Sequence, residues 1–163
     1  MDWDALAWLF AGAVTLHNVE EAVLLPRWSR TVSRWSVPVA TTDFRFAVVV
    51  LTVLAYACAW ISIRGQLFAT YVLCGYALAM LLNAFIPHLA ATIALRRYAP
   101  GTATAFCFNV PVASLLLYGA VTQHRIEFVT FAWGGPLTVI AIVSAIPLLF
   151  ALGRRLRAWT GSS

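Results

Sequence analysis

Five long apolar runs limit the folds open to this chain more than any other feature of the sequence. A helix needs about 20 residues to cross the hydrocarbon core of a bilayer. With 62% hydrophobic and 10% charged residues, the chain lacks the polar surface that a water-soluble domain requires. The runs also lack the alternating pattern of a membrane β-barrel. We predict an all-α, polytopic membrane bundle forming a single domain over residues 1–163, with five transmembrane spans near residues 4–25, 44–63, 67–95, 102–121 and 128–152.

Arginine supplies every basic residue and predicts the orientation of the bundle. Cytoplasmic loops of membrane proteins carry an excess of positive charge. If the N-terminus lies outside, only Arg64 and Arg125 fall on the outer side, and nine arginines fall on the inner side. We therefore expect the N-terminus outside and the C-terminus cytoplasmic, in a multi-pass protein of the cell (inner) membrane. The nine are Arg27, Arg30, Arg34, Arg45, Arg96, Arg97, Arg154, Arg155 and Arg157.

The ends of the predicted spans carry further expectations. Asp2 and Asp4 stand where a cleavable signal peptide has basic residues, so we expect the first helix to be retained. Residues 26–38 repeat Arg and Trp at a spacing of seven, which fits either a short interfacial helix or an irregular basic loop. Arginines at span ends suit anionic headgroups, so we expect membrane lipids, and no nucleic acid, as partners. The two longest runs should tilt, or break at Pro87 and Pro147.

The first span carries three ionisable residues that are costly inside a membrane. Glu20 and Glu21 follow His17 by three and four positions, so a helix brings both carboxylates to the face that carries His17. Two adjacent carboxylates in a medium of low dielectric constant need a proton, a metal ion or an arginine between them. Intramembrane ionisable groups mark functional sites by default. A structural hydrogen bond from His17 to a neighbouring helix is the alternative.

Other spans place polar residues at a similar depth. Asn83 and His88 flank Pro87 in the third span, and Asn109 lies in the fourth. Counting about 1.5 Å per helical residue from the inner ends puts Glu20 and His88 roughly 9–12 Å deep. His17 and Asn109 come out at about 12–14 Å. One polar site in the cytoplasmic half of the bundle explains this layer, although each Asn could instead join two helices.

The order of these motifs resembles a known family. Residues 17–21 read HxxEE, Asn83 and His88 follow, and residues 98–104 read YxPGxxT. This order resembles the HXXEE family of small bacterial integral membrane proteins. The matching motifs run from His17 to Thr104, and the last predicted span carries none. The resemblance implies a membrane enzyme or a metal-binding protein of undefined activity, and it supplies no reaction.

The leading hypothesis is a metal-dependent membrane enzyme, with hydrolysis favoured. His17, Glu21 and His88 would bind a divalent ion, zinc or iron, and leave one position open for water. Glu20 would act as the general base or as a ligand of a second ion. Asn83 and Tyr98 would be catalytic, orienting the water or stabilising an oxyanion.

The predicted substrate is an amphiphile drawn from the inner leaflet. Arg96 and Arg97 stand at the mouth of the site, where guanidinium groups suit an anionic headgroup. Asn109 and Thr104 complete the predicted substrate-binding set.

Three other functions stay open. Paired glutamates with a histidine can activate water without a metal, as in the intramembrane CAAX-type proteases. The same ligand set fits a non-haem iron oxidase or hydroxylase acting on a lipid. A proton-coupled transporter is also consistent with intramembrane His and Glu, and a homodimer would supply the repeat that the chain itself lacks.

Overall fold

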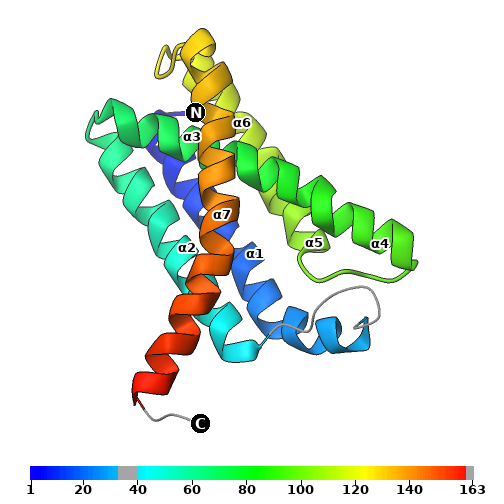
Figure 1. Ribbon diagram of the computed structural model, residues 1–163. Coiled ribbons are helices and arrows are strands. Elements are labelled where there is room, and N and C mark those ends of the chain that lie inside the picture. The colour runs from blue at the N-terminus through cyan, green and yellow to red at the C-terminus, as the bar shows by residue number, and fades with distance from the viewer. Residues whose placement is uncertain (33–39, 161–163) are drawn as a thin grey trace.

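The computed structural model describes residues 1–32 and 40–160, and within these ranges the regular structure is entirely helical (Figure 1). This confirms the predicted all-α class. The α-helices are α1 (Trp3–Thr31), α2 (Thr41–Ile63), α3 (Leu67–Asn83), α4 (Ala90–Leu95), α5 (Thr102–Thr104), α6 (Val110–Thr122) and α7 (Phe128–Thr160). Two π-helical segments, η1 (Ala84–Leu89) and η2 (Ala105–Asn109), connect α3 to α4 and α5 to α6.

Four helical stretches within the described ranges are long and apolar enough to cross a membrane. They are Thr41–Ile63, Leu67–Leu95, Thr102–Thr122 and Phe128–Trp159, and they coincide with four of the five predicted spans. The protein is thus a membrane helical bundle. The remaining predicted span lies in α1, which has 29 residues, but the polar residues of its second half lower its hydropathy. A crossing by α1 stays a prediction.

α1 continues past the predicted end of the first span. Pro26 lies inside the helix, which reaches Thr31. Proline has no N–H to donate to the carbonyl one turn earlier. That carbonyl belongs to Ala22, and it accepts a hydrogen bond from Arg45 Nε of α2 at 3.3 Å. The predicted interfacial segment, residues 26–38, therefore begins as the end of α1, and residues 33–38 lie outside the described residues.

The two prolines of the long spans behave differently. The path from α3 to α4 departs from α-helical geometry in η1, where Ile86, just before Pro87, has φ −132° and ψ 108°. α7 instead stays helical through Pro147. The break predicted at Pro87 is confirmed, and no break occurs at Pro147.

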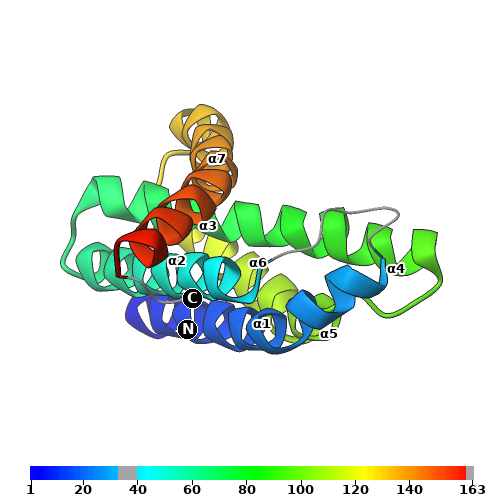
Figure 2. The same ribbon diagram turned by 60° about the horizontal axis from the view of Figure 1, so that its bottom comes forward.

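The helices pack in layers around a core of aromatic and small residues. Figure 2 shows α1 and α7 on opposite faces, with α2 and α3 between them. α1 packs against α2 and α6, and α7 packs against α3 and α2. The largest fully buried side chains include Trp3, Phe10, Leu73, Tyr76 and Leu116.

Gly75 allows α3 and α7 to approach closely. A Cβ atom at this position would lie 2.4 Å from Thr138 Cβ and 2.7 Å from Thr138 Cγ2. Small residues at helix contacts are a recurring feature of membrane bundles, because packing there depends on close backbone approach. Gly12 of α1 is the opposite case, with no neighbouring atom within 4 Å of a Cβ built on it.

Replacing each glycine by alanine separates packing from helix propensity. We expect Gly75→Ala to lower the free energy of unfolding by about 1–3 kcal/mol through overpacking against Thr138. Gly12→Ala should be neutral or stabilising by up to about 1 kcal/mol, because alanine favours the helix. Thermal unfolding in detergent measures both changes. Equal effects of the two substitutions would contradict the close α3–α7 contact.

Candidate metal centre

Three side chains from α1 and η1 meet at one point in the bundle. His17 Nε2 lies 3.7 Å from Glu21 Oε2, and His88 Nε2 lies 3.4 Å from Glu21 Oε1. The two imidazole rings meet edge to face, with ring centroids 4.9 Å apart. Ligands about 2.1 Å from a common ion in a tetrahedral site lie about 3.4 Å from one another. The structure thus brings together His17, Glu21 and His88, three of the four residues predicted to bind metal.

The break within η1 explains how Asn83 and His88 face each other. Residues five apart point about 140° away from each other on an unbroken α-helix, and the non-helical Ile86 between them changes this direction. Asn83 Nδ2 lies 2.9 Å from His88 Nε2 and 3.2 Å from His17 Nε2. One amide group therefore contacts both imidazoles. Asn83 was predicted to be catalytic, and it lies at the centre of the ligand cluster.

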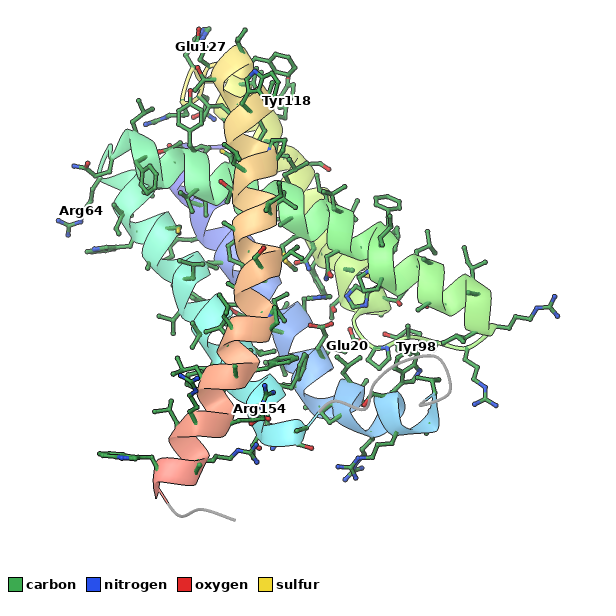
Figure 3. All side chains as sticks on the ribbon, in the orientation of Figure 1. Glu20, Arg64, Tyr98, Tyr118, Glu127 and Arg154 are labelled. Atoms are coloured by element: carbon green, nitrogen blue, oxygen red, sulfur yellow. The ribbon has the colours of Figure 1, made fainter. Side chains whose placement is uncertain are left out.

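Glu20 lies outside this cluster and binds the loop that follows α4. Its Oε1 accepts hydrogen bonds from the Tyr98 hydroxyl and from Gly101 N at 2.9 Å. Its Oε2 accepts hydrogen bonds from Thr104 N at 3.2 Å and Thr104 Oγ1 at 2.6 Å. Figure 3 shows Glu20 and Tyr98 pointing toward each other. Successive helix positions differ by about 100°, so Glu20 and Glu21 point to different neighbours.

Tyr98 contributes to the site through Glu20. Partial burial and the hydrogen bond to the Glu20 carboxylate raise the pKa of the Tyr98 hydroxyl, so it stays protonated and donates. The Tyr98 oxygen also accepts a hydrogen bond from Ala103 N at 3.1 Å. Tyr98 thus fixes the loop on α1, and its hydroxyl is directed at Glu20 and Ala103.

Thr104 links Glu20 to His17 and determines which ring nitrogen of His17 carries the proton. The single hydroxyl hydrogen of Thr104 goes to an oxygen of Glu20 or to Gly101 O. Thr104 Oγ1 is then available to accept from His17 Nδ1, which lies 3.2 Å away. A proton on Nδ1 leaves Nε2 with a free lone pair that faces the cluster. This is the orientation that second-shell partners give to metal-binding histidines.

His88 has the same arrangement. Its ring forms a hydrogen bond with the backbone of Pro100, which has only a carbonyl to offer. Its Nε2 faces Asn83 and Glu21. Both histidines therefore present Nε2 as an acceptor beside a carboxylate, and among the described residues no N–H or O–H group donates to Glu21. The two Nε2 atoms and the carboxylate are all acceptors, and the Asn83 amide is the one donor that the described residues bring to them, an arrangement that a cation can bind.

Gly101 allows the loop to pass against both imidazoles. Its φ of +93° is in a region that L side chains rarely adopt. A Cβ atom here would lie 2.4 Å from His88 Cε1 and 2.9 Å from His17 Cε1. Two independent requirements, backbone conformation and space, therefore select glycine at this position.

A cavity of about 150 Å³ opens beside the ligand cluster. His17, Glu21 and Asn83 line one side of it, and apolar residues of α2, α3 and α7 line most of the remainder. The site therefore combines metal-ligand chemistry with a neighbouring apolar space.

The predicted substrate-binding residues are dispersed. Arg96 and Arg97 are exposed at the end of α4, and Thr104 contacts Glu20 and His17. Asn109 is fully buried in η2 and does not line the cavity beside the cluster. Among the described residues, its Oδ1 and Nδ2 have no hydrogen-bond partner. Buried amides without partners are rare in folded proteins.

Sequence reasoning missed two parts of the site. The contacts of Gly101 with the imidazoles were not predicted, although the glycine of YxPGxxT was a signal for a close approach. The cavity-lining residues of α2 and α7, such as Phe44 and Phe150, gave no signal, because apolar side chains facing a cavity and facing lipid look alike in a sequence.

Comparisons with known proteins agree with the motif pattern. A family model described as "Protein of unknown function with HXXEE motif" matches residues 8–116, which include every residue of the ligand cluster and its loop. The chain is 38% identical over 146 residues to the uncharacterized protein YrkK of Bacillus subtilis (strain 168). That match covers 88% of this chain and 92% of the relative. No solved structure matches the chain.

The protonation state of His17 tests the link through Thr104. Thr104→Val removes the hydroxyl, and Thr104→Ser keeps it. In metal-free protein we expect ring ¹⁵N chemical shifts to place the His17 proton on Nδ1 in the wild type and in Thr104→Ser. In Thr104→Val the Nε2-protonated form should appear. A spectrum of His17→Gln assigns the signals, and unchanged shifts in Thr104→Val would rule out the link.

A pair of glycine substitutions tests the loop packing. Gly65 has a φ of +82° and open space where a Cβ atom would stand, with no neighbouring atom within 4 Å, so Gly65→Ala carries only the backbone cost of about 1–2 kcal/mol. Gly101→Ala carries that cost and also displaces the two imidazoles, so we expect a further loss of about 1–3 kcal/mol. Thermal unfolding in detergent compares the two variants. Equal losses would show that the loop does not press on the histidines.

Proposed function

This chain belongs to the HXXEE family, and from that premise we propose that it is a metal-dependent membrane enzyme that hydrolyses an amphiphilic substrate. The observation that supports this most is the meeting of His17 Nε2, His88 Nε2 and the Glu21 carboxylate beside an apolar cavity. Two histidines and one carboxylate are a ligand set of zinc hydrolases. A bound divalent ion would supply a polarised carbonyl and an acidified water at this point.

The described contacts assign roles to the surrounding residues. Glu21 presents one oxygen toward each histidine and accepts no hydrogen bond from the described residues, so it can bind an ion through one oxygen and take a proton at the other. Glu20 accepts four hydrogen bonds and is less suited to be the general base. We assign Glu20 a positioning role, through Thr104 to His17. Asn83 would orient the reacting group beside the two imidazoles.

One observation favours a second candidate, oxygen chemistry at non-haem iron. Two histidines and one carboxylate with open positions are also the ligand set of iron oxygenases, which need no separate carboxylate base. The engagement of Glu20 by the loop fits that requirement. Zinc with hydrolysis and iron with oxygen consumption are therefore the two alternatives that experiments should separate.

The proposal includes a fifth crossing by α1, in a bacterial inner membrane, with the N-terminus outside and the C-terminus cytoplasmic. α1 runs antiparallel to α2 along much of its length. Trp3 Nε1 donates to Ser62 Oγ at 3.2 Å, Asn18 Nδ2 donates to Thr52 Oγ1 at 2.7 Å, and Arg45 Nε donates to Ala22 O. A helix that pairs in this way with a membrane-spanning helix lies at the same depth in the membrane. The distribution of arginines supports the orientation.

Metal analysis of purified protein tests the centre. We expect one divalent ion per chain, and His17→Ala or His88→Ala should weaken binding by more than about 100-fold. Glu20→Gln, which alters a residue that acts through Thr104, should weaken it by about 10–100-fold. His124→Gln is the control, since His124 is exposed between α6 and α7. Metal content that is absent in the wild type, or unchanged in His17→Ala, would refute the metal centre.

The reaction is tested on membrane lipid extracts with metal-loaded protein. Hydrolysis should release new polar products without oxygen uptake, and a chelator should stop it. Oxygen consumption that depends on iron would instead support the second candidate. Activity that survives complete metal removal would exclude both.

A further inference from the structure

The cavity beside the ligand cluster has an unusual division between polar and apolar walls. Its polar lining comes from His17, Asn18, Glu21 and Asn83. Asn18 donates an amide hydrogen to Thr52 Oγ1, which leaves His17, Glu21 and Asn83 as the polar wall. The other walls are apolar, apart from the hydroxyl of Tyr76. Apolar cavities of this size stay dry and accept hydrocarbon guests.

The cavity extends along three helices. Lining residues span seven positions on α2 (44–51) and on α3 (76–83), and eight on α7 (142–150). Seven helical positions correspond to about 10 Å. A cavity of about 150 Å³ holds a guest of about the size of benzene, so this one suits a short segment of one hydrocarbon chain and not two chains side by side.

Specific contacts lie at the two ends of the lining. At one end, the Tyr76 hydroxyl donates to Leu51 O at 3.2 Å. At the other end, the rings of Phe44 and Phe150 meet with centroids 6.1 Å apart. His17, Glu21 and Asn83 provide the polar part of the lining, so the polar end of a chain in the cavity would lie against them.

A groove on the outer surface of the bundle has more exposed lining residues on α2 than the cavity has. The groove between α1 and α2 includes Val49 and Val53, which are 60% and 61% exposed and face the surrounding lipid. Ala47 and Val48, which line the cavity, are 2% and 8% exposed. The cavity is thus buried on its α2 side, whereas Val143 of α7, which also lines it, is 58% exposed and marks where it opens.

We infer that the substrate is an amphiphile that places one hydrocarbon chain in this cavity and its functional group against Glu21 and Asn83. This inference rests on the proposed function for the reaction, but binding of the chain requires only the cavity. The substrate class is therefore a lipid-like molecule with a chain that enters the cavity, such as an acyl ester or amide.

Photolabelling with a diazirine derivative of decan-1-ol tests the cavity in metal-free, detergent-purified protein. We expect labels on cavity-lining residues of α2, α3 and α7. Ala47→Phe fills the cavity and should reduce this labelling at least about tenfold, the cost of removing about two methylenes from their buried site. Val53→Phe adds the same ring to the lipid-facing side of α2 and should leave labelling unchanged. Equal labelling in all three proteins would overturn the inference.

A second variant covers the case in which Ala47→Phe fails to fold. Met80→Ala enlarges the cavity, so competition should shift in favour of tetradecan-1-ol over decan-1-ol relative to the wild type. An unchanged preference would count against the cavity as the chain site.

Metal content is measured in the same preparations, because the two proposals can fail separately. Labelling that depends on Ala47 in a protein that binds no metal would refute the proposed function and leave the chain site standing. Metal binding without such labelling would do the reverse.

Discussion

The four hydrogen bonds accepted by Glu20 hold the loop of residues 98–104 against α1, and the geometry of the site depends on this attachment. The loop carries Gly101, whose backbone lies against both imidazoles, and Thr104, which accepts the His17 proton. A carboxylate that accepts several donors is strongly held in place, because charged hydrogen bonds are stronger than neutral ones. The HxxEE and YxPGxxT motifs are therefore two halves of one structural unit.

The two adjacent glutamates have different partners because of helix geometry. About 100° separates successive helix positions, so Glu20 faces the loop while Glu21 faces the histidines. Their assignment to one face, which the spacing from His17 suggests, is correct for Glu21 and only approximate for Glu20. This divergence satisfies only one of the two adjacent carboxylates. One is satisfied by protein donors, and the other is left with acceptors around it.

Hydropathy predicted four membrane-spanning helices well, since long apolar runs have few alternatives in a bilayer. The ligands His17, Glu21 and His88 could be predicted because ionisable residues are expensive in such runs. The break beside Pro87 could be predicted too, because proline removes a backbone hydrogen bond, but the direct contact of Asn83 with His88 depends on the dihedral angles of Ile86. The extension of α1 past Pro26 could not be predicted from the sequence either. It depends on a hydrogen bond that Arg45 of α2 donates to Ala22 O. Long-range contacts of this kind leave no local signal.

Asn83 shows why a cation fits the cluster better than protein groups do. Its amide has two hydrogens, and the two nearest ring nitrogens can accept both of them. These two hydrogen bonds satisfy the ring nitrogens but leave Glu21 without a donor. Its oxygens lie 3.4 Å from His88 Nε2 and 3.7 Å from His17 Nε2, and both nitrogens are acceptors. A protonated Glu21 could donate to only one nitrogen, which already accepts from Asn83. A divalent ion can bind to both nitrogens and the carboxylate at once, since each donates a lone pair to it. The amide then becomes free to turn toward the cavity, where the functional group of a bound chain would lie.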